Sequence, residues 1–224
     1  VGTEWCENVE PMWSPREKSA LVESLRKAGP TAPTLCEGWQ TRHLAAHLLL
    51  RGQEPWRLTP RPWAPDAADR LIDDVADGLR ERAAYTDAVE TFAAGPDGAN
   101  PMRLVRGRAD EAMNLLEYVV HHEDVRRGGA EPLPPRELPA SMLDDIWRRL
   151  GQFSTFAFRS APVGVVQVVP GNRRRRARAG AVSVALTGGP VEQTLFAMGR
   201  RGAAQVQVTG TPDAVAAFEA WAAH

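Results

Sequence analysis

Cysteine is scarce in this chain, which has 224 residues and only two cysteines, Cys6 and Cys36. Two cysteines in a chain of this size do not provide a disulfide framework or a cysteine-rich structural zinc site. A bound metal ion would therefore need its ligands mainly from histidine and carboxylate side chains.

Long apolar runs and an excess of charge are also absent. No apolar stretch approaches the roughly 20 residues that a membrane-spanning helix needs, and the first residues lack the basic and apolar regions of a secretory signal. The formal net charge is -1, whereas domains that bind nucleic acid usually carry a basic excess. We therefore expect a cytoplasmic protein that binds neither membranes nor nucleic acid.

The residues up to about 130 predict an all-α bundle after an N-terminal extension over 1–13. Ser14 is expected to cap the first helix, over about 15–27, with Glu17 as its capping-box glutamate. Thr41 is expected to cap a second helix. Further helices are expected from near residue 66, over about 86–93 and over about 108–127, with a glycine- and proline-rich loop at 95–101 before the last of them.

The pattern changes after a linker candidate at 128–139. A helix is expected near 139–158, and beyond it the apolar residues alternate with a period of two, which is typical of strands. Strands are expected over 163–169, 173–179, 182–186 and 203–209, and helices over 191–198 and 212–221. The sequence therefore predicts two domains, a helical bundle over 14–130 and a small α+β domain over 136–224.

Three residues in the bundle are candidates for binding a divalent metal, most plausibly zinc. Glu117 and His121 are four residues apart on one expected helix, so their side chains share a face. Such a pair also occurs as a simple surface contact. His47 favours the metal, because an imidazole among the apolar residues of the second helix would be costly to bury without a partner.

Two histidines and one glutamate leave one tetrahedral position open, as in catalytic zinc sites. A ligating histidine usually donates its second N–H to an outer acceptor, and Glu123 and Asp124 are the candidates for that role. His122 points about 100° away from His121 and is interpreted as a packing histidine. His43 is expected to be exposed.

Two stretches resemble the DinB-like, mycothiol-dependent maleylpyruvate isomerase superfamily of actinobacteria: PTLCEGWQTRHLAAHLLLR and EYVVHHEDVRR. In that superfamily a four-helix bundle holds a metal through one histidine on helix two and an E-x-x-x-H pair on a later helix. The resemblance places His47 in the first motif, and Glu117 and His121 in the second. It extends over residues 14–224, since APVGVVQVV and ALTGGPVEQTLFAMGRRGAAQVQVTG resemble the family's α+β module, which is similar to sterol-carrier-protein-like folds.

The resemblance implies a metal that activates mycothiol, or a related low-molecular-weight thiol, for attack on a small electrophilic substrate. The reaction would be an isomerisation or an S-transfer. Arg200 and Arg201 resemble the position where the isomerase presents a basic residue to the cleft between the domains, so Arg200 is the catalytic candidate. The alternative is that both arginines only cap the end of a helix.

Other features have structural interpretations beside functional ones. The arginines at 173–176 and 178 could form a nucleic-acid patch, but residues of a strand alternate between faces, which favours a solvated hairpin edge. Cys36 could be a nucleophile, yet no histidine is near it in sequence, which favours a packed cysteine. Trp56 or Trp63 could line the cleft.

Two functional hypotheses from different classes remain open. The first is a metal-dependent, mycothiol-type transferase or isomerase. The second is a non-enzymatic metal-binding module with the same fold. The absence of a fourth protein ligand in the motifs favours an open site and hence the enzyme, whereas the absence of an obvious second acid or base favours the module.

Overall fold

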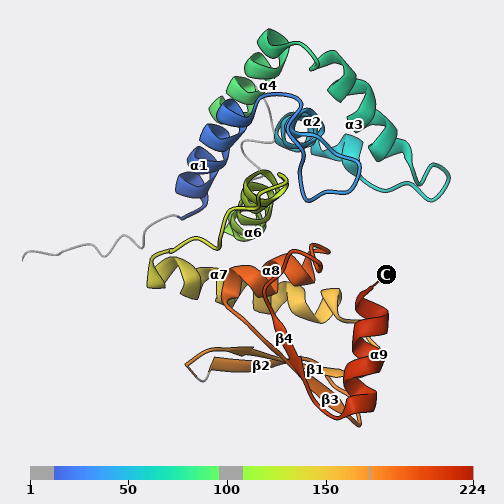
Figure 1. Cartoon of the computed structure of the whole chain (residues 1–224). Coiled ribbons are helices and arrows are strands. Elements are labelled where there is room, and N and C mark those ends of the chain that lie inside the picture. The colour runs from blue at the N-terminus through green and yellow to red at the C-terminus, as the bar shows by residue number, and fades with distance from the viewer. Residues whose placement is uncertain (1–12, 96–107, 172, 224) are drawn as a thin grey trace, which may run out of the picture.

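The computed structural model describes residues 13–95, 108–171 and 173–223, and it consists of a helical N-terminal part followed by an α+β part (Figure 1). The prediction of this fold class is confirmed. The N-terminal part contains α1 (Trp13–Ala28), α2 (Thr41–Gln53), the short 3-10 helix η1 (Pro55–Leu58), α3 (Ala67–Gly78), α4 (Arg82–Ala94) and α6 (Arg108–Arg127). Residues 1–12 of the expected extension and residues 96–101 of the expected loop lie outside the described residues.

The helices of the N-terminal part bury one apolar face each. Helix α1 packs against α4 and α6, and α2 packs against α3 and α4. Their shared core includes Leu21, Leu25, Leu44, Leu48 and Tyr85, all almost completely buried. Burial of side chains at helical spacing holds α2 and α6 in fixed positions, which is what a site built from both helices requires.

Two expected helix caps are wrong. Helix α1 begins at Trp13, so Ser14 lies inside it, and Glu17 is buried and bound to Arg136 and His122. A buried carboxylate gains more from the guanidinium of Arg136 and the ring of His122 than from a backbone N–H at a helix start. Thr41 is the first residue of α2 rather than its cap, because its hydroxyl donates to the carbonyl of Gly29 and Gln40 takes the cap position.

The C-terminal part contains α7 (Ala140–Ala157), β1 (Gly164–Val169), β2 (Arg173–Arg178), β3 (Ser183–Thr187), α8 (Pro190–Ala197), β4 (Gln207–Thr209) and α9 (Pro212–Ala222). The strand order is β2-β1-β3-β4. Strands β1 and β3 are parallel and both outer pairs are antiparallel. In Figure 1, α7 and α8 lie between the sheet and the N-terminal helices.

Most expected boundaries in this part are close to the observed ones, but β4 is much shorter than the expected strand over 203–209. The chain from Arg200 to Ala204 forms turns, in which the N–H groups of Ala203 and Ala204 donate to the carbonyl of Arg200. This segment contacts α6 through two bonds, from Arg200 to Asp124 and from Arg127 to the carbonyl of Ala203. None of the described helices is long and apolar enough to cross a membrane.

Buried ion pairs connect the two parts. Glu123 on α6 is completely buried and binds Arg127 of the same helix and Arg136 of the following segment. Arg127 also binds Glu192 on α8, with 2.8 Å between Nη2 and Oε1. These contacts fix α8, and with it the segment around residue 200, next to the C-terminal half of α6.

Candidate metal centre

His47, Glu117 and His121 lie together, with one potential ligand atom from each within 4.8 Å of the others. His47 Nε2 is 3.2 Å from Glu117 Oε1, and His121 Nε2 is 3.8 Å from the same oxygen. His47 comes from α2, and the other two come from successive turns of α6. Because the two helices are packed in the bundle, three residues from two distant sequence segments converge on one point.

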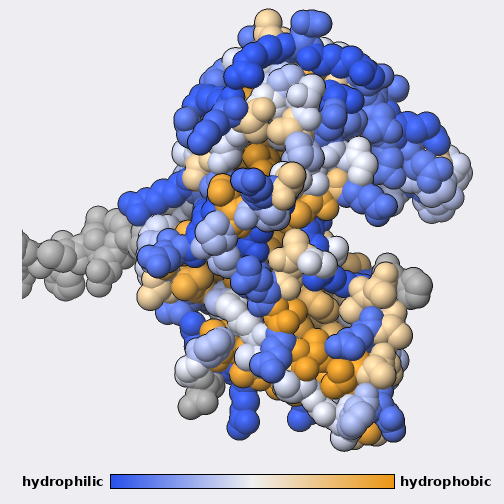
Figure 2. Space-filling view, in the orientation of Figure 1, coloured by the Kyte–Doolittle hydropathy of each residue, from blue (hydrophilic) through white to orange (hydrophobic). Residues whose placement is uncertain are grey.

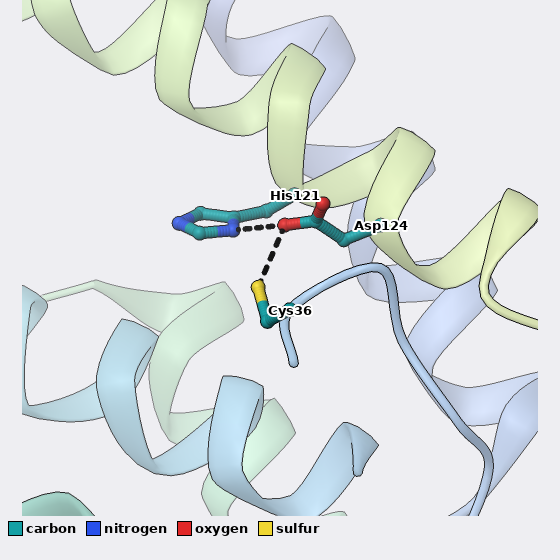
Figure 3. A group of neighbouring side chains, drawn as sticks. All are labelled: Cys36, His121 and Asp124. Atoms are coloured by element: carbon teal, nitrogen blue, oxygen red, sulfur yellow. Dashed lines mark hydrogen bonds and ion pairs between the residues drawn. The ribbon is translucent and has the colours of Figure 1, made fainter. Parts of the chain in front are cut away.

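The second nitrogen of His121 is fixed by Asp124. His121 Nδ1 donates to Asp124 Oδ2 over 2.9 Å, one turn further along α6 (Figure 3). This contact holds the ring so that Nε2 is directed toward Glu117, whose Oε1 is 3.8 Å away. Of the two outer acceptors considered from the sequence, Asp124 therefore contacts the candidate ligand His121, whereas Glu123 binds arginines.

Glu117 also has an outer partner, which sequence reasoning did not identify. Arg51 on α2 forms an ion pair through Nε with Glu117 Oε2, and its Nη2 donates to the side chain of Asn114 over 3.1 Å. The oxygen Oε1 is therefore left facing the two histidines. The signal was available, because Arg51 follows His47 by four residues and so shares its helical face.

A second cluster of potential ligands consists of Cys36, His121 and Asp124. Figure 3 shows these three side chains pointing toward one another, with Cys36 on the loop before α2 and the others on α6. The guanidinium of Arg200 already binds this cluster, with 2.6 Å from Nη2 to Asp124 Oδ2 and 3.0 Å to the Cys36 sulfur. A cation thus neutralises the carboxylate, so this cluster is a poorer metal site than the first.

Cys36, interpreted from the sequence as a packed cysteine, is half-buried and has polar partners from distant segments. Its thiol donates to Asp124 over 3.2 Å, although the two residues are 88 positions apart. No local spacing reveals such a contact.

Arg200 is close to the site, as predicted, but its donors are taken by Asp124, Cys36 and the carbonyl of Met198.

The charges of the site are strongly coupled. Burial alone would raise the pKa of Glu117, but hydrogen bonds from His121 and His47 outweigh it and lower that pKa well below its usual range. Burial lowers the pKa of His47. Burial also disfavours a charged His121, but its hydrogen bonds, first of all with Asp124, raise its pKa well above the usual value. Asp124, bound by Arg200 and His121, has its pKa lowered to about 2 against the effect of burial.

A cavity of about 600 Å³ opens onto the three residues. Its polar lining includes Cys36, Glu37 and Arg200, and its apolar walls are Trp39, Val120, Phe153, Ala197 and Met198. The lining comes from both parts of the chain, and Figure 2 shows a hollow between them. The possibility that Trp56 or Trp63 lines the cleft is not supported, because these side chains are 52% and 83% exposed and the tryptophan in the cavity lining is Trp39.

The remaining candidates lie outside the cluster. His122 is buried between Glu17 and Ser24, which confirms its interpretation as a packing histidine. His43 is half-buried rather than exposed, because its ring accepts the N–H of Gln40 at the start of α2. The arginine run forms β2 at the edge of the sheet, as expected.

The chain belongs to the family of the mycothiol maleylpyruvate isomerase N-terminal domain, whose family model matches residues 16–151. Its fold is similar to that of two crystal structures of mycothiol-dependent maleylpyruvate isomerase. One is of a mutant in which a histidine is replaced by alanine (19% identity, TM-score 0.59), and the other is of the enzyme itself (18% identity, TM-score 0.57). Each match covers 88% of this chain and 91% of the other. No curated protein sequence matches the chain.

Proposed function

We propose that this protein binds one divalent metal ion, zinc in the first instance, through His47, Glu117 and His121. The main support is that these three residues come from two helices and meet at one cavity. Residues of both parts of the chain line this cavity. The residues fit such an ion, because two imidazoles and one carboxylate are a zinc donor set and Asp124 holds His121 in the ligating tautomer.

We further propose that the site serves a mycothiol-type thiol and a small electrophile, in an isomerisation or S-transfer. A bound zinc ion would supply Lewis acidity that favours the thiolate form of a coordinated thiol. The chain's own residues prepare the site. Arg51 holds one oxygen of Glu117 and leaves the other toward the histidines, and the apolar walls of the cavity offer a surface to the apolar part of a substrate.

Arg200 has a defined place in this proposal. Its guanidinium lies on the cavity wall, where it binds both oxygens of Asp124 and the sulfur of Cys36. In this geometry it supports the carboxylate that orients His121. We propose Arg200 as a positioning residue that acts on His121 through Asp124.

The second candidate function is a metal-binding module without catalysis. The contacts of Arg200 favour this module, because the guanidinium at the cavity is already bound by protein groups. The two functions differ in one consequence. The enzyme converts a thiol and an electrophile into a product, whereas the module only retains the ion.

Two measurements test the proposal in sequence. Elemental analysis of the protein prepared with excess zinc should find about one ion per chain, and none in the His121→Ala variant. Mass spectrometry should then detect a thiol adduct or an isomerised product with a panel of small electrophiles and mycothiol. A wild type without stoichiometric metal contradicts both functions. A metal-loaded protein that converts none of the electrophiles favours the metal-binding module over the enzyme.

A further inference from the structure

Cys36, His121 and Asp124 form a second donor set for a metal ion beside the first one. One potential ligand atom of each lies within 4.8 Å of the others. Asp124 Oδ2 is 2.9 Å from His121 Nδ1 and 3.2 Å from the sulfur of Cys36 (Figure 3). A sulfur, a ring nitrogen and a carboxylate oxygen are ligands that zinc and softer divalent ions accept.

The two donor sets compete for one histidine. The first donor set, which consists of His47, Glu117 and His121, shares the ring of His121 with the second. Glu117 lies on the side of Nε2, at 3.8 Å, and Asp124 lies on the side of Nδ1. A neutral imidazole has one lone pair, so it binds an ion through one nitrogen at a time. An ion in the second donor set would therefore take His121 away from the first.

The guanidinium of Arg200 occupies the second donor set. Its Nε and Nη2 are 2.8 Å and 2.6 Å from the two oxygens of Asp124, and Nη2 is also 3.0 Å from the sulfur of Cys36. Arg200 thus binds two of the three donors and supplies the positive charge that a metal ion would supply. Because a guanidinium does not lose its proton in a protein, this charge is permanent.

The fold also holds Arg200 in this position. Its Nη1 donates to the carbonyl of Met198 over 2.7 Å, and the preceding helix α8 is bound to α6 through Glu192 and Arg127. Asp124 is completely buried. An ion that entered the second donor set would have to displace a fixed guanidinium from a buried carboxylate and leave that guanidinium without its partner, which is costly.

From these contacts we infer that Arg200 determines where the metal binds. It excludes divalent ions from the second donor set and so keeps Nε2 of His121 for the ion of the first. The inference goes beyond the proposed function and rests on it only for the place of the intended ion. The excluding cation belongs to the α+β part, whereas all three donors belong to the helical part, so the selectivity depends on how the two parts pack.

Cadmium is the probe for this exclusion, because its bonds to sulfur add an ultraviolet charge-transfer band that its bonds to nitrogen and oxygen lack. All proteins are the full chain with Cys6→Ser, so that Cys36 is the one remaining thiol. The parent protein with Arg200, the Arg200→Met variant, and Arg200→Met combined with Cys36→Ser are titrated with cadmium in a buffer without thiols. Circular dichroism verifies that each variant keeps the helix content of the parent.

Two further variants complete the series. Arg201→Met is the matched control, because the neighbouring guanidinium of Arg201 donates to the carbonyls of Trp221 and Ala222 instead of Asp124. Arg200→Lys retains one positive charge beside the buried carboxylate but makes fewer hydrogen bonds, and it carries the test if Arg200→Met does not fold.

Arg200→Met is expected to bind cadmium through sulfur at least about a hundredfold more tightly than the parent, since two charge-assisted hydrogen bonds correspond to about this factor. Arg200→Lys is expected to do so about tenfold more tightly, with one such bond lost. The band should be absent when Cys36→Ser is added, and Arg201→Met should behave as the parent does. A parent that binds cadmium through sulfur as tightly as the folded Arg200 variants overturns the exclusion, as does the absence of the band from those variants.

The exclusion and the proposed function fail separately. The sulfur band reports only the second donor set, whereas uptake of an ion by the parent without this band reports the first. A parent that takes up no ion, beside an Arg200→Met variant that gains the band, supports the exclusion and contradicts the proposed function. A parent that retains about one ion per chain, beside Arg200 variants without the band, has the opposite meaning.

Discussion

Asp124 Oδ2 accepts a hydrogen bond from His121 Nδ1 over 2.9 Å while both oxygens of Asp124 bind the guanidinium of Arg200. The chain thus connects a residue of the α+β part to a candidate metal ligand of the bundle through one carboxylate. Since α8 is held on α6 by Arg127 and Glu192, the orientation of His121 depends on how the two parts of the chain pack.

Replacement of Asp124 by asparagine tests this connection. We expect the Asp124→Asn variant to bind zinc about tenfold to a hundredfold more weakly, because an amide no longer holds the imidazole as a carboxylate does. Competition with a chromogenic chelator gives the affinity. Zinc affinity equal to that of the wild type would show that Asp124 does not orient His121.

The pair of Asp124 and His121 also predicts a pH dependence of the metal-free protein. The raised pKa of His121 contributes stability that is fully present below pH 6.5 and is lost as the pH rises through the raised value. The pKa of Asp124, lowered from 3.8 to about 2, contributes stability that is present above pH 3.8 and lost as the pH falls toward 2. The pair should therefore stabilise the fold most between these limits.

Urea unfolding in the presence of a chelator measures this effect. The difference in free energy of unfolding between wild type and Asp124→Asn should be largest at about pH 5 to 6 and should shrink as the pH rises. A difference that grows from pH 6 to pH 9 would contradict the assigned direction of the His121 shift.

Arg51 is expected to control the coordination of Glu117. Without the ion pair on Oε2, both carboxylate oxygens of Glu117 are free to bind the metal ion. The second oxygen would then occupy the coordination position that a thiol needs. Arg51→Met should retain the metal but bind thiols about tenfold more weakly. Arg57→Met is the matched control, because Arg57 is exposed and pairs with the half-buried Glu54, away from Glu117. Equal thiol affinity in Arg51→Met and wild type would show that Arg51 does not control the coordination of Glu117.

Glu123 is expected to be the most important single side chain for the junction of the two parts. It is completely buried and binds Arg126, Arg127 and Arg136. Glu123→Ala should lower the free energy of unfolding by about 3 kcal/mol, because it removes a buried carboxylate that compensates three guanidinium groups and leaves Arg127 and Arg136 with one carboxylate each, Glu192 and Glu17. The exposed Glu131→Ala is the control, with an expected change of about 0.5 kcal/mol or less. A similar loss in both variants would show that the buried network does not stabilise the junction.

The sequence predicts the parts of the site that follow helical periodicity. Glu117 and His121 share a face of α6 by spacing alone, and His47 is conspicuous among apolar residues of α2. Cys36 and Arg200 meet at Asp124 only because the loop before α2 and the segment after α8 fold onto α6, and no local pattern encodes such contacts. The predicted caps at Ser14 and Thr41 were wrong for a related reason, since tertiary partners replaced local ones.

The division of the chain into domains that end at 130 and begin at 136 stays a prediction. Limited proteolysis between these positions would test it.

The most direct test of the account is the cobalt spectrum of the wild type before and after addition of millimolar mycothiol. The account predicts that cobalt binds at about one ion per chain and that the thiol adds a sulfur-to-metal charge-transfer band, which the His47→Ala and Glu117→Ala variants lack. A wild type that binds no cobalt, or whose cobalt spectrum is unchanged by mycothiol and by smaller thiols, would contradict it.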